Sequence, residues 1–275
     1  MTERCQRMAL SLGTARAARG NSVLLGGRCA CEGKVLCMPP FWLWVLALVF
    51  LCVAALCALV IVLDVLLGHR QPMAVMNVVW PVTALYFGPV ALLAYWKLGR
   101  AQPRMGRDMA KAMQMEMAKP QHQAHGAEKP FWQRVFVSDS HCGAGCTLGD
   151  IIGEWLIFLA GITLLGQMLW PEYIVDFLLA YLLGILFQFW AIAPMRRLSL
   201  RAGLWAAIKA DTISLTFFEI GLFGWMAISH FLLFPALLPD NPTYWLMMQI
   251  GMMLGFLTSY PVNWWLVRAG IKAAM

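Results

Sequence analysis

Charged residues are scarce in this sequence. Only 13% of its 275 residues are Asp, Glu, Lys or Arg, whereas a soluble globular domain carries about 25%. Hydrophobic residues make up 61%, above the usual fraction of about 45–50%. A chain with so few charges cannot cover a large surface in water. The composition therefore excludes an ordinary soluble domain and indicates a membrane protein.

The sequence also lacks the motifs of several enzyme classes. It contains no phosphate-binding glycine loop, haem-attachment motif, zinc-protease motif or nucleophile elbow. Its eight cysteines follow no spacing from which a disulfide pairing can be deduced. Whether the protein is an enzyme therefore stays open, and the sequence leans against it.

Long apolar runs are what the sequence does contain. A membrane-crossing helix needs about 20 mostly apolar residues. Six runs meet this requirement, at residues 41–67, 74–96, 148–169, 173–195, 203–233 and 244–267. We therefore expect an all-α fold, a polytopic bundle of six transmembrane helices whose main partner is the lipid bilayer.

Basic residues predict the orientation of this bundle, because cytoplasmic loops are enriched in Lys and Arg. They gather before the first run, between the second and third, between the fourth and fifth, and after the sixth. The other three connections contain only Arg70. This pattern predicts cytoplasmic termini and a location in the cell (inner) membrane. It also accounts for the basic loops, so nothing indicates nucleic-acid binding.

Four regions follow from this reading. Residues 1–40 form a basic segment that we expect to be disordered, and 41–97 form a transmembrane hairpin. Residues 98–134 form a cytoplasmic loop, and 135–275 a four-span domain. Methionines recur every four residues in the loop, followed by His122 and His125. This pattern fits either an amphipathic helix on the membrane surface or an acceptor for a soft metal.

The segment SHCGAGCTLGDIIGEW, residues 140–155, gathers thiols, an imidazole and carboxylates. Thr147 and Asp150 resemble a capping box, which predicts a helix that begins near residue 148. A glycine turn before it would bring the side chains together as a zinc or copper site. The alternative is a turn and capped helix with only a structural role. The candidate ligands are His141, Cys142, Cys146, Asp150 and Glu154.

Ionisable residues inside the predicted spans are a second candidate site. Each costs about 2.5–3.5 kcal/mol at the membrane centre, so it normally faces the bundle interior and has a partner. The fifth span contains Lys209, Asp211 and Glu219. We expect Lys209 to pair with Asp150 or Glu154. Such a pair either fixes the helix register or belongs to a polar pathway for protons or cations.

Two pairs of small residues, Gly149 with Gly153 and Gly251 with Gly255, are spaced for close helix contact. Contacts through these glycines could form either a homo-oligomer or a hetero-oligomer, and the sequence does not decide between them.

Several unusual runs in the second half resemble a known family. They are SHCGAGCTLGDIIGEW, FQFWAIAPM, KADTISLTFFEIGLFGWM and MMQIGMMLGFLTSYPVNWWL. In this order they are similar to the domain-of-unknown-function family 4396, over about residues 135–275. The resemblance implies a multi-pass membrane protein of unassigned activity. It supplies no functional residue.

Three functions remain after this reading. The first is transport or handling of a soft, copper-like metal ion through the Cys/His site at the inner end of the third span. The second is a membrane thiol oxidoreductase, although three residues separate Cys142 and Cys146 where the thioredoxin-type motif has two. The third is a structural or assembly partner of another membrane complex. The cofactor stays unknown, with copper or zinc as the candidates.

Overall fold

The computed structural model describes residues 30–31, 34–35, 39–71, 73–101, 130–196, 199–235 and 237–272. The chain divides into two compact units, Met1–Cys37 and Met38–Met275. In the first unit, β1 (Ala30–Cys31) and β2 (Lys34–Val35) pair antiparallel. The rest of the expected disordered segment lies outside the described residues. So do the methionines and histidines of the 98–134 loop, and both predictions stay predictions.

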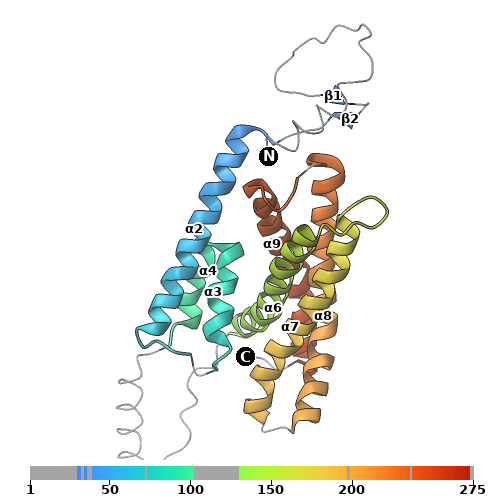
Figure 1. Ribbon diagram of the computed structural model, residues 1–275. Helices are drawn as coiled ribbons and strands as arrows, with labels where there is room; N and C mark the ends of the chain where they lie inside the picture. The colour runs from blue at the N-terminus through green and yellow to red at the C-terminus, as the bar shows by residue number, and fades with distance from the viewer. Residues whose placement is uncertain are drawn as a thin grey trace, which may run out of the picture. The chain divides into compact units, whose positions relative to one another are not determined.

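The second unit is helical, which confirms the all-α expectation for the described part of the bundle (Figure 1). Its elements are α2 (Phe41–Leu66), α3 (Met76–Phe87), α4 (Pro89–Ala94), η1 (Tyr95–Gly99), α6 (Phe131–Ala160), α7 (Leu169–Arg196), α8 (Leu200–Ile228), η2 (Ser229–Leu233) and α9 (Pro242–Arg268). The first predicted span coincides with α2 and the fourth with α7. The fifth coincides with α8 and η2 together, and the sixth with α9. The predicted domain border at residue 135 falls inside α6.

Four of these helices are long and apolar enough to cross a membrane. They are Phe41–Leu66, Phe131–Ala160, Leu169–Ala191 and Asp211–Leu233. Large apolar side chains remain exposed along them, as lipid contact requires. The chain is therefore a membrane protein, but these four do not amount to the six spans that the apolar runs predict.

The second predicted span, residues 74–96, does not form one crossing helix. It consists of α3, α4 and η1, and its end returns to the end of α2 from which it started. There, Arg100 Nη2 lies 2.8 Å from Asp64 Oδ1, and the Tyr95 hydroxyl donates to Asp64 Oδ2 over 2.7 Å. The segment is thus a helical hairpin that folds back on itself.

The break in this hairpin has a local cause. Gly88 has φ +53° and ψ −126°, a conformation that L side chains rarely adopt, and Pro89 follows at the first position of α4. At 1.5 Å per residue, the 12 residues of α3 span about 18 Å, too little to cross a hydrocarbon core of about 30 Å.

The hairpin places the first and last described residues of this unit at opposite ends of the bundle. Pro39 and Phe41 line a cavity with Asn241, just before α9. At the other end of α9, Trp264 packs on Phe131, the first residue of α6, with 4.7 Å between ring centroids. Figure 1 shows α2 beginning at the upper end and α6 at the lower end. The described residues thus do not reproduce the predicted arrangement with both ends on one side.

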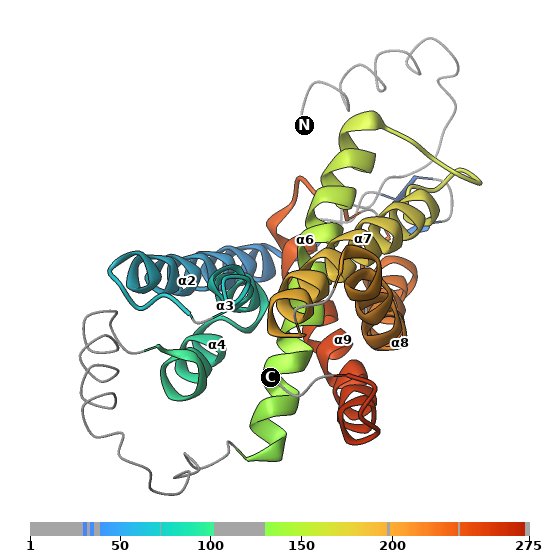
Figure 2. The same ribbon diagram turned by 90° about the horizontal axis from the view of Figure 1, so that it is seen from below.

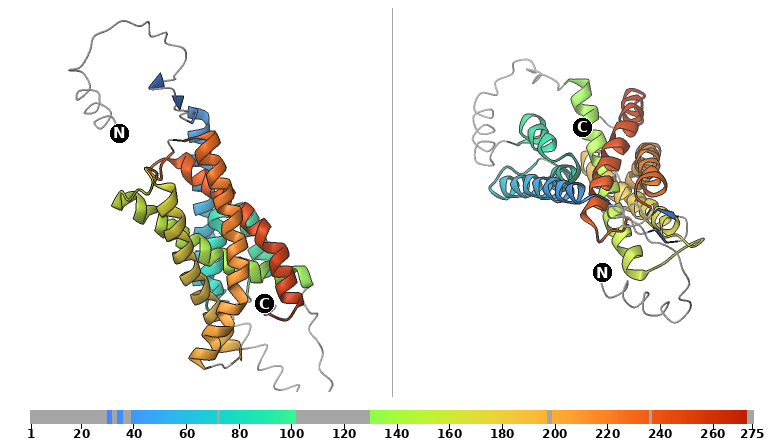
Figure 3. Two further views of the ribbon diagram at one scale, coloured as in Figure 1. Left: turned by 90° about the vertical axis from the view of Figure 1, so that its right-hand side faces the viewer. Right: turned by 90° about the horizontal axis from the view of Figure 1, so that it is seen from above.

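Helix α6 is the central element. In the most apolar stretch of α6, 61% of the residues are buried, whereas the corresponding fraction in the other three membrane-length helices is 28–33%. Figure 2 and the right-hand view of Figure 3 show α6 between α2–α4 on one side and α7–α9 on the other. Helix α6 thus has neighbours on both sides that bury its polar side chains, while Ile152, Leu156 and Leu159 remain exposed.

Helices α6 and α7 approach so closely because small residues face each other. A Cβ on Gly145 would lie 2.6 Å from the Cα of Gly184, and one on Gly149 would lie 2.5 Å from the Cα of Ala180. One turn further, Gly153 leaves room for the carboxyl group of Asp176. Close backbone approach through small residues is a common way to pack membrane helices.

This packing predicts the effect of adding one methyl group. Gly149→Ala forces α6 and α7 apart and should lower the free energy of unfolding by about 1–3 kcal/mol. Gly224 on α8 has open space around it, so Gly224→Ala should be neutral or stabilising by up to about 1 kcal/mol. Detergent-induced unfolding followed by circular dichroism measures both. Equal stability of the two variants would contradict the close approach.

Candidate functional site

Acidic residues dominate the interior of the bundle. Seven of the nine Asp and Glu residues in the described part of the chain are no more than 5% exposed. They are Asp139, Asp150, Glu154, Glu172, Asp176, Asp211 and Glu219. Among the side chains that the structure describes, Lys272 is the only buried Lys or Arg. Buried acids therefore greatly outnumber buried bases.

The predicted glycine turn at residues 141–146 is wrong. Helix α6 runs without a break from Phe131 to Ala160, so no helix begins near residue 148. Gly143 and Gly145 serve close packing instead. A Cβ on Gly143 would meet the Tyr86 hydroxyl at 2.8 Å. The glycines thus admit neighbouring helices and leave the backbone helical.

In a continuous helix, the candidate ligands lie on different faces than they would in a turn. Asp139, Cys142, Cys146, Asp150 and Glu154 recur every three or four residues and form one stripe along α6. His141 does not belong to that spacing, and its Nδ1 lies 3.0 Å from the carbonyl oxygen of its own helix at residue 137.

The three predicted soft ligands therefore do not converge. Within the described residues, no group of three or more His, Cys, Asp or Glu side chains is arranged to hold a metal ion. Cys142 and Cys146 are both free, and both are buried.

The upper part of the stripe belongs to a cluster of four side chains near the end of the bundle where α7 and α9 begin. Glu154 lies beside Asp176 and Tyr244. Glu172, one turn from Asp176 on α7, adds a further carboxyl group. None of these carboxylates belongs to an ion pair among the described residues.

The middle of the stripe joins α6 to α8. Asp150 interacts electrostatically with Glu219, and Cys146 lies next to Glu219. Within the described part of the chain, both side-chain oxygens of Asp150 and of Glu219 are buried without a hydrogen-bond partner. We name the five carboxylates at these two levels the acidic row. Its members are Asp150, Glu154, Glu172, Asp176 and Glu219.

The opposite end of the bundle contains the buried cation. Lys272 Nζ lies 3.1 Å from Asp211 Oδ1 and donates to Asn263 Oδ1 over 2.8 Å. A longer contact of 3.4 Å joins it to Ser214 Oγ. Burial lowers the pKa of Lys272, but the neighbouring Asp211 contributes to a rise that outweighs it, so its pKa lies above the ordinary value.

Asp139 completes this network from α6. Its Oδ1 accepts hydrogen bonds from Ser259 Oγ at 2.8 Å and from Asn263 Nδ2. The same amide donates to Ser214 Oγ over 2.6 Å. Three helices and the chain after α9 thus meet at one polar centre, which we name the Lys272 network.

The predicted ion pair of Lys209 with Asp150 or Glu154 is wrong. Lys209 is exposed on α8, two residues before the buried Asp211, and therefore faces away from the bundle interior. Residues two apart on a helix lie on different faces. Of the predicted polar pathway, Asp211 and Glu219 lie inside and Lys209 does not.

Several residues of the site were missed by sequence reasoning. From its position near the end of a predicted span, Asp176 is expected to reach water. Lys272 is expected to belong to the basic segment after the sixth span. A usable signal did exist, because Glu172 and Asp176 are one helical turn apart, as are Asp150 and Glu154. Two such pairs on adjacent antiparallel helices predict a shared cluster.

A small cavity reaches the acidic row from the end where α7 and α9 begin. Its lining includes Glu172, Ser229, His230 and Tyr244, and its volume is about 30 Å³. A water molecule needs about 10–15 Å³ by this measure, so the cavity has room for about two. Of the acidic row, Glu172 lines this cavity.

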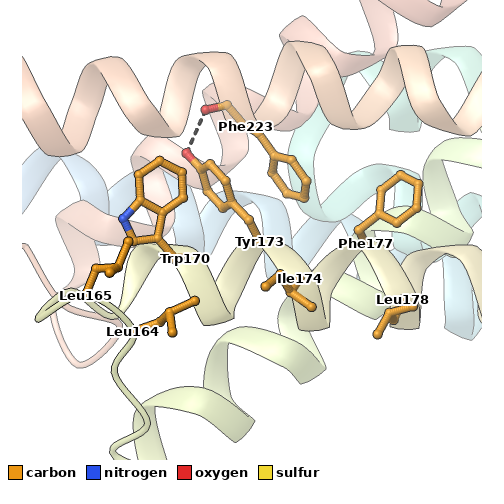
Figure 4. A pocket seen from close by; sticks show the side chains of 8 residues that line it. All are labelled: Leu164, Leu165, Trp170, Tyr173, Ile174, Phe177, Leu178 and Phe223. Carbon is orange, nitrogen blue, oxygen red and sulfur yellow. Dashed lines mark hydrogen bonds between the residues drawn. The ribbon is translucent and has the colours of Figure 1, made fainter.

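A larger groove of about 610 Å³ lies between α7 and α8, outside the row (Figure 4). Its walls are apolar, with Trp170, Ile174 and Phe177 among them. The Tyr173 hydroxyl is tied to the carbonyl oxygen of Phe223 at 2.7 Å. Among the described residues, no carboxylate or amine lines this groove, and its lining includes the exposed side chains of Leu165 and Leu178.

The Lys272 network predicts a large effect of one amide. Asn263→Leu leaves Asp139 and Lys272 short of partners and should lower the free energy of unfolding by about 3–5 kcal/mol. Asn77 on α3 bonds only backbone groups and is half-buried, so Asn77→Leu should cost about 1 kcal/mol. The same unfolding measurement compares them, and an equal loss would contradict the network.

The comparison with protein families gives one match. The family described as "Domain of unknown function (DUF4396)" matches residues 131–272, from the first residue of α6 to Lys272. Neither the curated proteins nor the solved structures contain a match to the chain. The family region therefore contains the acidic row and the Lys272 network in full. Because the match covers more than half of the sequence, the chain belongs to this family of domains of unknown function.

Proposed function

We propose that α6–α9 form a cation pathway across the membrane, in which buried carboxylates exchange protons for a transported cation. The observation that carries the proposal is the acidic row. Its five carboxyl groups are no more than 5% exposed, and none belongs to an ion pair among the described residues.

Energetics supports this reading. A carboxylate at the membrane centre costs about 2.5–3.5 kcal/mol, so five charged ones would cost at most roughly 12–18 kcal/mol. A folded protein has a total stability of only about 5–15 kcal/mol. Most of the row must therefore carry protons or bind cations, and a group that holds either one can exchange it for the other.

The length of the polar stripe also supports a pathway. Asp139 and Glu154 are 15 positions apart on α6, which corresponds to about 22 Å of helix. The hydrocarbon core is about 30 Å thick. The small cavity beside Glu172 continues the stripe at one end, and the Lys272 network continues it at the other.

The proposal includes a topology. We infer five crossing helices, α2, α6, α7, α8 and α9, with α3–α4 as a re-entrant hairpin. The α7–α8 connection and the end of α9 carry Arg201 and Arg268, so this end faces the cytoplasm of a cell (inner) membrane. The break at Gly88 is buried by protein, as non-helical backbone at membrane depth requires.

Proteoliposomes that contain a pH-sensitive dye test the proposal. An imposed gradient of a transported cation, tested singly from Na⁺, K⁺, Mg²⁺, Ca²⁺, Mn²⁺, Zn²⁺ and Cu⁺, should change the internal pH. Glu219→Gln removes a proton-binding group and should slow this change by about tenfold or more, a barrier increase of about 1.4 kcal/mol.

Asp240→Asn is the matched control, because Asp240 is exposed and lies outside the row. It should leave the flux unchanged. No cation-driven pH change with the wild-type protein, or an equal rate for Glu219→Gln, would contradict the proposal.

The soft-metal cargo is a second candidate, favoured by one observation. Cys142 and Cys146 lie in the same stripe as the carboxylates, and Cys146 is next to Glu219. Thiolates select Cu(I) over hard cations, whose preferred ligands are oxygens. The oxygen-rich acidic row itself favours protons or a hard cation. The two thiols are therefore the only feature that supports a soft-metal cargo.

Metal analysis of the purified protein tests this second candidate. A copper cargo predicts about one Cu(I) per chain after loading, lost in the Cys142→Ser/Cys146→Ser variant because thiols are the soft ligands. Cys57→Ser, which changes a buried thiol on α2, should keep the metal. Metal retention in the double variant would contradict the thiol site.

The two other functions have less support. A thiol oxidoreductase needs an accessible thiolate, whereas Cys142 and Cys146 are buried. An assembly role rests on the small-residue pairs, but Gly149 and Gly153 contact α7, and Gly251 and Gly255 contact α8. These faces are filled within the chain, so an oligomer stays a prediction without a surface assigned to it.

A further inference from the structure

The ammonium group of Lys272 is buried among oxygen atoms at the end of the bundle where α9 ends. Three oxygens surround it, namely Asp211 Oδ1 at 3.1 Å, Asn263 Oδ1 at 2.8 Å and Ser214 Oγ at 3.4 Å. Its side chain is 0% exposed. Oxygen atoms from carboxylate, amide and hydroxyl groups are the ligands that hard cations take.

The same centre has oxygens that Lys272 does not use. In the described part of the chain, Asp211 Oδ2 and Asp139 Oδ2 are buried and have no hydrogen-bond partner. Both carboxyl groups belong to side chains that are no more than 1% exposed. A cation at this centre thus has more carboxylate oxygen available than the ammonium group takes up.

Lys272 reaches this centre from outside the helices. Helix α9 ends at Arg268, and the chain turns back at Gly270, which has φ +70°. The backbone amides of Ile271 and Lys272 donate to the carbonyl oxygen of Leu266 at 3.0 and 3.2 Å. The cation is therefore delivered by a short turn at the end of α9 and not by the rigid bundle. A third backbone hydrogen bond, from Gly270 N to the carbonyl oxygen of Val267 at 3.1 Å, also holds the turn.

We propose that Asp211, Asn263 and Ser214, with Asp139 behind them, form a binding site for a hard monovalent cation. The Lys272 ammonium group occupies that site as a tethered cation. In the proposed pathway, Lys272 in this site also closes the cytoplasmic end, and this gating role rests on the proposed function. The binding site itself does not.

The charge of the occupant favours a monovalent ion. The ammonium group contributes a single positive charge, and among the described residues Asp211 is the carboxylate that forms an ion pair with it. Na⁺ or K⁺ replaces that charge without a change in the electrostatic balance, whereas a divalent ion adds a second charge. Other groups near Lys272 are Cys142 and Asp139 on α6, and His141 interacts with it at longer range.

The test measures the melting temperature of the purified full-length protein against NaCl or KCl, with choline chloride holding the ionic strength constant. Lys272→Met should gain a rise in Tm of about 5 °C or more at saturating Na⁺ or K⁺, because the ion binds only the folded state. The wild-type protein should show no such rise, since its site is filled. Lys272→Met/Asp211→Asn should lose the rise.

Lys209→Met is the matched control, because Lys209 is exposed on α8. It should behave as the wild-type protein. Lys272→Gln, which keeps hydrogen-bonding capacity, serves as the second variant if Lys272→Met does not fold. An unchanged Tm in the folded Lys272 variant, a rise that survives Asp211→Asn, or a rise only with Mg²⁺ or Ca²⁺ would overturn the site.

A flux measurement separates this inference from the proposed function. If Na⁺ or K⁺ raises the Tm of Lys272→Met but liposomes of the wild-type protein move no cation, the site stands and the pathway fails. If wild-type flux depends on Glu219 while the Lys272 variant binds no cation, the pathway stands and the site fails.

Discussion

Lipid provides no solvent for an ion, and this constraint organises the chain. Charged groups that enter the membrane must be enclosed by protein. The enclosure comes from α6, whose small residues let α7 approach and whose polar stripe then faces α7, α8 and α9. Seven carboxylates and one lysine share this interior, so charge pairing alone does not balance it. We propose that protons or cations supply the remaining positive charge.

Much of the architecture was predictable because lipid-facing helices follow composition. Four apolar runs coincide with α2, α7, α8 with η2, and α9. The run at residues 74–96 shows where composition fails. Its apolar length is sufficient, but the Gly88–Pro89 step breaks it into two short helices, and the Asp64–Arg100 pair fixes the end of the hairpin. A hydropathy count does not contain that long-range contact.

The candidate site was predictable in its residues more than in its geometry. Asp150, Glu154, Asp211 and Glu219 were expected inside and lie inside. The stretch at residues 140–147 was expected to turn because glycines permit turns, yet glycines also permit close helix packing, and the neighbours Tyr86 and Gly184 decide which occurs. The expected partner Lys209 faces outward. The buried ion pair is instead formed by Lys272, which is 61 positions from its partner Asp211 in the sequence.

Infrared difference spectroscopy of the protein in lipid tests the central claim most directly, because the carbonyl stretch of a protonated carboxyl group is distinct from that of a carboxylate. The account predicts protonated carboxyl groups at neutral pH, a band that shrinks in Glu219→Gln and weakens when a transported cation is added. A spectrum in which all the buried carboxyl groups are ionised, with no response to protons or cations, would contradict it.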